Sequence, residues 1–225
     1  MRRRAATLAL AMAAAGALAA CASPGERPRY RGLRPTANPS AVVAAELAFA
    51  RAAQEKGQWT AFRDYAADDA VMFVPQPVAA KSWLKTQANP AQAVKWQPYA
   101  VWSSCDGSLA VTKGAWRRPD GAVGYFTTVW RRQRNGDYKW VLDQGDTLAQ
   151  PLPEPEMIAA QVADCSRPAP LDVPPAPGRT VGWSDDRTLQ WTVEVEPDNA
   201  RSFVVRRWTG DGYEEALRSD VAAGK

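Results

Sequence analysis

The chain has 225 residues, of which 28 are Lys or Arg, 24 are Asp or Glu and none is His. Three of the basic residues lie in an N-terminal stretch that we expect to be removed, which leaves 25 basic against 24 acidic residues and predicts no nucleic-acid or other polyanionic partner. The lack of histidine excludes Ser-His-Asp and Cys-His nucleophiles and histidine-ligated zinc or haem, whereas 46% hydrophobic residues and ten tryptophans exclude wholesale disorder.

Residues 1–20 are predicted to be a cleaved export signal, because a basic start precedes an alanine-rich apolar run that is too short for a permanent membrane span. The stretch Leu18-Ala19-Ala20-Cys21 resembles the bacterial lipobox, which implies that Cys21 becomes the acylated N-terminus. The alternative is an ordinary secretory signal in which Cys21 is incidental. Since Ala22 rather than aspartate follows, the resemblance implies an anchor in the outer membrane, facing the periplasm. Residues 21–39, with four prolines, are predicted to be a flexible tether.

Two further cysteines, Cys105 and Cys165, belong to the exported part of the chain. In an oxidising compartment an even pair is more often a disulfide than a thiol site, so we predict a bridge between them. The alternative is a pair of free, reactive or metal-binding thiols, but the sequence has neither a Cys-x-x-Cys spacing nor a histidine to support it. We therefore predict no metal site and no cofactor.

The first part of the exported chain is predicted to be mainly helical. Asp68 and Asp69 are expected to end the second helix and to cap backbone amides, and the alternative of a metal site has no supporting ligand spacing. A short strand over residues 71–74 is stopped by prolines. Apolar residues at helical spacing predict three helices, over residues 40–57, 59–67 and 79–87.

After Pro90 the period of the apolar pattern changes from 3.6 to 2 residues. Turn signals such as Asp106-Gly107 separate the alternating runs, so we predict an antiparallel meander of long strands. In the third strand Phe126, Thr128 and Trp130 share one face. The predicted strands cover residues 94–104, 109–117, 123–132 and 138–144.

The last part of the chain is a proline-rich segment followed by more strands. Residues 151–179 contain eight prolines and are predicted to be a linker held through Cys165, with a short helix over residues 156–163. Residues 180–225 are predicted to be a β-meander extension. Because so small a sheet needs a partner surface, we expect it to pack on the main domain or to extend its sheet. Its predicted strands cover residues 180–183, 189–196, 201–208 and 213–217.

The order of these elements is α+β, and it lets the sheet curl around the first helix. Four stretches carry a more specific likeness: the helix ending in Gly57, the run from Phe62 through Ala70 to Pro75, and the closing segments 125–130 and 140–143. Through these stretches, residues 41–148 resemble the nuclear transport factor 2-like superfamily, which is also called SnoaL-like or ketosteroid-isomerase-like. The resemblance implies, for residues 40–150, a cone-shaped curled antiparallel sheet packed on three N-terminal helices, with the small C-terminal β extension added.

The same resemblance bears on catalysis. Enzymatic members have a tyrosine on the first helix, an aspartate at the end of the first strand and often an acid on a late strand. These positions fall close to Phe49, at Val74 and near Thr128. Because valine cannot move a proton and phenylalanine cannot donate one, the sequence favours a non-catalytic envelope lipoprotein whose cone binds a small apolar or aromatic molecule or a partner protein.

Two alternatives stay open. An isomerase- or dehydratase-type enzyme would use Asp143 and Tyr125, provided that both reach one cavity, and a structural assembly module of the envelope would have a cone filled by its own side chains. The strand tryptophans either pack in the core or stack on a flat ligand. The resemblance also implies homodimers that pack sheet to sheet. The candidates for the ligand pocket are Met72, Val74, Trp116, Thr128, Trp130 and Asp143.

Overall fold

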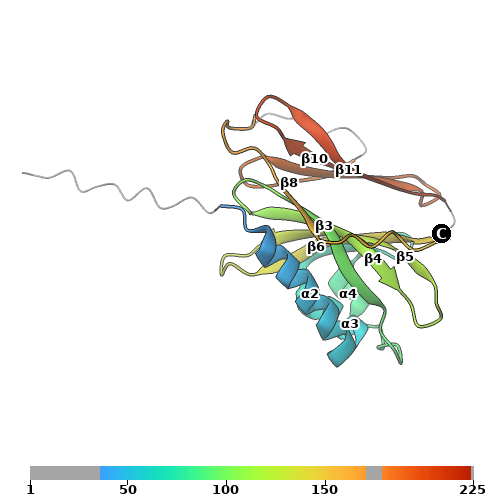
Figure 1. The fold of residues 1–225 in the computed structure, drawn as a ribbon. Coiled ribbons are helices and arrows are strands. Elements are labelled where there is room, and N and C mark those ends of the chain that lie inside the picture. The colour runs from blue at the N-terminus through green and yellow to red at the C-terminus, as the bar shows by residue number, and fades with distance from the viewer. Residues whose placement is uncertain (1–35, 171–178, 224–225) are drawn as a thin grey trace, which may run out of the picture. The chain divides into compact units, whose positions relative to one another are not determined.

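The computed structural model describes residues 36–170 and 179–223 (Figure 1). The predicted export signal, Cys21 and most of the predicted tether lie outside these residues. All described residues belong to a single unit that spans Pro35–Lys225. Among them, no helix has both the length and the apolar character that crossing a bilayer requires.

Two helices open the described chain, and a third, short helix follows at residue 80. The first begins where the Asn38 side chain accepts a hydrogen bond from the backbone of Ala41 at 3.2 Å, and it ends at Gly57, whose φ of 98° favours glycine. The last has only five residues and is shorter than the predicted helix over 79–87. The helices are α2 (Pro39–Lys56), α3 (Gln58–Tyr65) and α4 (Ala80–Leu84).

Asp68 and Asp69 do not end a helix, as the sequence predicted, but lie at exposed positions inside strand β1 (Ala66–Phe73). Their carboxylates pair with cations on neighbouring elements, Asp68 with Lys81 at 2.5 Å and Asp69 with Arg131 at 2.6 Å. Two acidic residues are tolerated in this strand because both side chains reach water and a partner. No cluster with the make-up of a metal site occurs among the residues that the structure describes.

Seven strands form the first sheet, sheet A, in the order β2-β1-β6-β5-β4-β3-β7. The predicted meander is present in β3–β6, but β1 pairs with β6 and β7 pairs with β3 in parallel, so the sheet is mixed rather than antiparallel throughout. Only strands joined by a hairpin are obliged to run antiparallel, and these two pairs are distant in the chain. The remaining strands of sheet A are β2 (Pro77–Ala79), β3 (Lys95–Ser103), β4 (Leu109–Arg117), β5 (Val123–Arg132), β6 (Tyr138–Leu148) and β7 (Ala159–Val162).

Strand β7 replaces the short helix that the sequence predicted over residues 156–163. It is the edge strand beside β3, a position that tolerates the surrounding prolines because an edge needs only one row of hydrogen bonds. Just after it, Cys165 forms the predicted disulfide with Cys105, with the Cα atoms 5.4 Å apart. The bond ties the proline-rich segment to the turn between β3 and β4.

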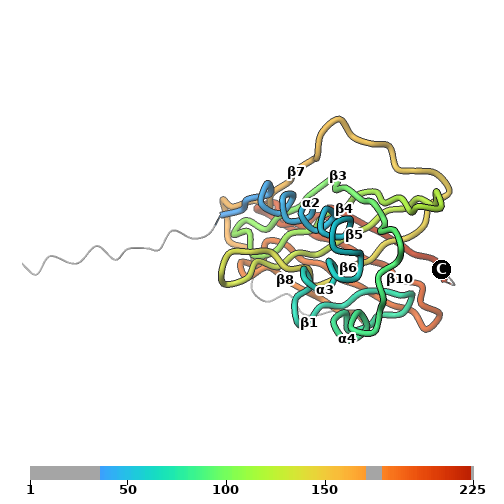
Figure 2. The backbone as a smooth tube through the Cα atoms, turned by 90° about the horizontal axis from the view of Figure 1, so that it is seen from below, coloured from blue at the N-terminus to red at the C-terminus, as the bar shows by residue number. Residues whose placement is uncertain are grey.

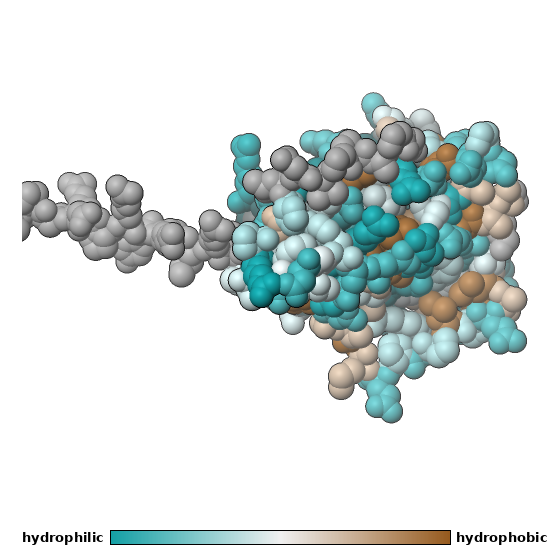
Figure 3. Space-filling view, turned by 90° about the horizontal axis from the view of Figure 1, so that it is seen from above, coloured by the Kyte–Doolittle hydropathy of each residue, from teal (hydrophilic) through white to brown (hydrophobic). Residues whose placement is uncertain are grey.

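The C-terminal strands form a separate sheet, sheet B, in the order β11-β10-β9-β8. It does not extend sheet A, one of the two outcomes expected, but covers its outer face (Figure 1). Val129 and Leu142 from sheet A share a core cluster with Leu189, Phe203 and Val205 from sheet B. The face of sheet B turned away from this core is largely hydrophilic (Figure 3). Its strands are β8 (Thr180–Trp183), β9 (Leu189–Val195), β10 (Arg201–Trp208) and β11 (Tyr213–Val221).

Two turns of the same design hold the sheets together, one over residues 104–109 in sheet A and one over residues 184–189 in sheet B. In the second, Asp186 Oδ1 accepts from the Ser184 hydroxyl at 2.7 Å and from the Thr188 hydroxyl at 2.8 Å, and Asp106 is bonded in the same way in the first. The turns also bond to each other, because Asp186 Oδ2 accepts from Asp106 N at 2.8 Å. We call this pair of turns the clasp.

The helices cover the inner face of sheet A (Figure 2). Phe49 of α2 packs edge-to-face on Phe62, Trp96 and Trp130, with ring centroids 4.8–6.0 Å apart. Trp130 and Trp140 are fully buried in this layer. Sheet A is therefore covered on both faces within one chain, by helices inside and by sheet B outside.

Candidate functional site

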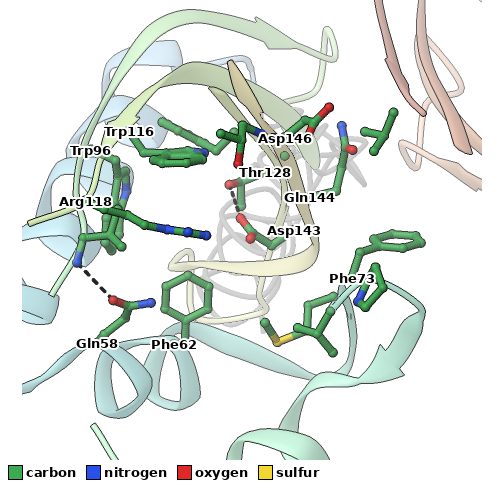
Figure 4. Close-up of a pocket in the computed structure, with 18 of the residues that line it drawn as sticks. Gln58, Phe62, Phe73, Trp96, Trp116, Arg118, Thr128, Asp143, Gln144 and Asp146 are labelled. Carbon is green, nitrogen blue, oxygen red and sulfur yellow. Dashed lines mark hydrogen bonds between the residues drawn. The ribbon is translucent and has the colours of Figure 1, made fainter. Parts of the chain in front are cut away.

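A cavity of about 400 Å³ remains between the helices and the inner face of sheet A (Figure 4). Aromatic side chains form most of its wall. Gln58 of α3 also faces it, and the Gln58 side chain is fixed because it accepts a hydrogen bond from Val94 N at 3.0 Å. The aromatic residues of the wall are Phe49, Trp59, Phe62, Phe73, Trp96, Trp116 and Phe126.

Asp143 supplies a carboxyl group to this wall. It lies on β6 directly opposite Thr128 of β5, and the Thr128 hydroxyl donates to Asp143 Oδ2 at 2.7 Å. Burial raises the pKa of Asp143 to about 7, against the opposing effect of the Thr128 hydrogen bond, and the nearby Glu46 carboxylate raises it further. A carboxyl group with such a pKa can either take up or release a proton near neutrality.

Glu46 is a second buried carboxylate, which the sequence interpretation missed. It is 0% exposed in the middle of α2 and accepts hydrogen bonds from Trp96 Nε1 at 2.8 Å, Thr112 Oγ1 at 2.6 Å and Trp130 Nε1 at 2.9 Å. Desolvation raises the pKa of Glu46, although the three hydrogen bonds oppose that effect. Its spacing from Val42 and Phe49, four and three residues away, was the signal that it faces the core.

Two guanidinium groups line the cavity beside these carboxyls. Arg118 follows β4 and lies over the Trp116 ring, with Cζ 5.1 Å from the ring centroid. Arg201 comes from sheet B, donates to Gln144 Oε1 at 3.2 Å and to Gly145 O at 2.8 Å, and lies 4.7 Å from the Phe73 centroid. Sheet B thus contributes to the cavity as well as covering sheet A.

The order and pairing of these elements decide what kind of domain encloses the cavity. Helices α2 and α3 lead into β1, and the curled meander β3–β6 closes around α2 with the cavity inside. This is the nuclear transport factor 2-like fold. The sequence resemblance predicted this α+β fold with its curled sheet and N-terminal helices, but with an antiparallel sheet where the structure has a mixed one.

Comparisons with known proteins find likenesses in structure only. No protein-family model matches the sequence, and no curated protein does. A candidate aromatic ring hydroxylase from Novosphingobium aromaticivorans is 20% identical, with a TM-score of 0.38 over 50% of this chain and 90% of its own. A candidate ketosteroid isomerase from Parabacteroides distasonis is 16% identical, with a TM-score of 0.40 over 52% of this chain and 97% of its own. The CaMKII hub of S. rosetta is 16% identical, with a TM-score of 0.38 over 51% of this chain and 99% of its own.

The nuclear transport factor 2-like domain places the predicted pocket residues as follows. Trp130 is not in the cavity wall, because its ring is fully buried and its indole N–H binds Glu46. Tyr125 is also absent from the wall. It alternates along β5 with Phe126 and Thr128, so it faces sheet B and does not meet Asp143. The predicted residues that do line the cavity are Met72, Val74, Trp116, Thr128 and Asp143.

Proposed function

We propose that the cavity binds one small, flat and mostly apolar molecule, with Asp143 and Thr128 as its inner polar contacts. The observation that carries this proposal is an aromatic-walled space of about 400 Å³ with a carboxyl group inside it. Binding sites for small molecules have volumes of this order, apolar walls and a few polar groups that fix orientation. Flat apolar ligands gain both area burial and offset or edge-to-face contacts from such rings.

A cavity-filling variant tests this proposal. In Val74→Trp the indole would occupy space in the cavity that Val74 lines, so we expect the affinity for 2-naphthol, measured by calorimetry, to fall at least tenfold. Met157→Trp is the matched control, because Met157 is 78% exposed and lies outside the cavity wall. Circular dichroism checks that both variants are folded. Equal affinity in the two folded variants would contradict binding in this cavity, and so would a wild-type protein that does not bind.

A second function, acid–base catalysis, is favoured by one observation, the pKa of Asp143 near 7. A carboxylate in an apolar cavity can remove a proton from carbon next to a carbonyl group. The test is the exchange of α-hydrogens of 2-tetralone for deuterium, followed by NMR. A rate above the buffer reaction that is lost in Asp143→Asn would support catalysis, and a rate unchanged by the variant would contradict it.

We further propose that the protein is a lipoprotein of the bacterial envelope, anchored through Cys21 in the outer membrane and facing the periplasm. The support is the sequence around Leu18-Ala19-Ala20-Cys21. Mass spectrometry of the membrane fraction should find an N-terminal peptide that begins with a triacylated Cys21, and Cys21→Ser should move the protein to the soluble fraction. An unmodified N-terminus in a soluble protein would contradict the anchor.

A further inference from the structure

The cavity of the proposed function has a cation on its rim. Arg118 stacks on Trp116, but among the described residues its guanidinium makes no hydrogen bond or ion pair. Figure 4 shows this side chain extending into the cavity, past Trp116 and toward the side of Asp143. A guanidinium has five N–H donors in a planar fork that matches a carboxylate. Its donors are therefore available to a ligand whose apolar part occupies the aromatic wall.

The second cation of the cavity, Arg201, already has hydrogen-bond partners in the protein. Its Nε and Nη2 atoms donate to Gln144 Oε1 and Gly145 O, and its guanidinium lies over Phe73. Arg201 therefore adds positive potential to the cavity but offers less of its fork to a ligand. A doubly charged phosphate group is best held by several free cations. One free guanidinium instead matches a singly charged acid.

Resting on the proposed function, we infer that the ligand is an aromatic carboxylic acid, with its ring system between the aromatic walls and its carboxylate bound by the Arg118 guanidinium. The ring plane then continues the stack that Arg118 already makes on Trp116. The acid group stays at the solvent-facing rim, where its desolvation is small, while the ring fills the apolar interior. Asp143 faces the opposite part of the ligand.

Calorimetry with two probes of the same shape separates this inference from the proposed function. We expect the full-length protein at pH 6 to bind 2-naphthoate at least tenfold more tightly than the neutral 2-naphthamide. In Arg118→Gln the affinity for 2-naphthoate should fall about tenfold, while that for the amide changes less than twofold. The matched control is Arg117→Gln, because Arg117 is the adjacent exposed arginine and does not line the cavity.

The outcomes are distinct. If both probes bind equally and Arg118→Gln affects neither, the ligand class is wrong although the cavity binds small molecules. If Arg117→Gln weakens 2-naphthoate as much as Arg118→Gln does, the specific contact with Arg118 is wrong. If neither probe binds, this inference and the proposed function are both overturned.

A second readout follows from the charges around Asp143. Glu46 from α2, Arg201 from β10 and the Thr128 hydroxyl act on this carboxyl, and an anionic ligand in the cavity would disfavour its ionised form. The affinity for 2-naphthoate should therefore decrease up to tenfold per pH unit above pH 7 and become pH-independent in Asp143→Asn. An affinity that is unchanged between pH 6 and pH 8 in the wild-type protein would contradict an anionic ligand in the same cavity as Asp143.

Discussion

Replacing Asp143 by asparagine should stabilise the folded protein, and more so as the pH rises. The pKa of Asp143 is about 7 in the fold, against 3.8 for an ordinary aspartate. The folded state therefore holds this proton more tightly than the unfolded state. The resulting contribution to stability is present at low pH and is lost as the pH rises toward 7.

The size of the effect follows from the two pKa values. At about 1.36 kcal/mol per pKa unit, the difference between the folded and unfolded pKa of Asp143 lowers the free energy of unfolding, relative to its value at low pH, by about 1.5 kcal/mol at pH 5 and by about 4 kcal/mol at pH 8. Because asparagine does not ionise, the free energy of unfolding of Asp143→Asn relative to wild type should increase by about 2.5 kcal/mol between these pH values. Titrating groups that do not interact with Asp143 occur in both proteins and largely cancel in the difference.

Urea unfolding followed by far-UV circular dichroism at pH 5, 6, 7 and 8 measures this difference. Thr128→Val is a useful companion, because it removes the hydrogen bond that lowers the pKa of Asp143 and should make the pH dependence steeper. The reasoning is refuted if the stability difference between Asp143→Asn and wild type is the same at every pH.

Three further predictions concern stability. Glu46→Ala removes three hydrogen bonds to a buried carboxylate, one of which is the only hydrogen bond of the Trp96 indole N–H among the described residues, and should lower the free energy of unfolding by about 3–5 kcal/mol, as measured by urea unfolding. Replacing Cys105 and Cys165 by serine removes a crosslink of sequence separation 60 and should cost about 4 kcal/mol, measured in the same assay against the oxidised protein. Asp186→Ala removes four hydrogen bonds of the clasp and should cost about 2 kcal/mol, seen as a lower Tm by calorimetry.

Each of these three has an internal control. Glu55→Ala changes an exposed position of the same helix and should stay within about 0.5 kcal/mol of wild type. Reduction of the wild-type disulfide should reproduce the serine variant, and a reduced protein as stable as the oxidised one would contradict the crosslink argument. Asp198→Ala removes a turn acceptor far from the clasp. If the Tm of Asp198→Ala were as low as that of Asp186→Ala, the contact between the two turns of the clasp would add nothing to the stability of the protein.

Local signals in the sequence were sufficient to predict the bounds of the long strands. Asp106-Gly107 and Pro119-Asp120-Gly121 lie at the turns that bound β4, and β4 and β5 begin and end where the alternation predicted. Alternation also predicted that Phe126 and Thr128 share one face, which is the inner face in the structure. The bounds and faces of these strands depend on residues that are close in the chain, so turn residues and apolar alternation are enough to predict them.

Features that depend on distant contacts were not predictable in this way. The parallel pairing of β1 with β6 and of β7 with β3 leaves no mark in periodicity, and a four-residue edge strand is too short to show alternation. A periodic pattern also cannot distinguish a sheet that extends its neighbour from one that covers it.

In the cavity, the sequence favoured Asp143 by its place on the last long strand, but Glu46 was overlooked because a single acid within an apolar helix looks solvent-facing. The donors that stabilise its burial, the indoles of Trp96 and Trp130 and the Thr112 hydroxyl, are 50, 84 and 66 residues away in the chain.

Sheet B is fastened to sheet A unevenly along its length. The clasp and the disulfide lie where β9 begins, whereas Arg201, which pairs with Val195 at the far end of β9, touches the rim of the cavity through Gln144 and Gly145. Any loosening of the two layers should begin at the Arg201 end, because that end lacks the double turn. The Arg201 guanidinium thus belongs both to the cavity wall and to the contact between the two layers.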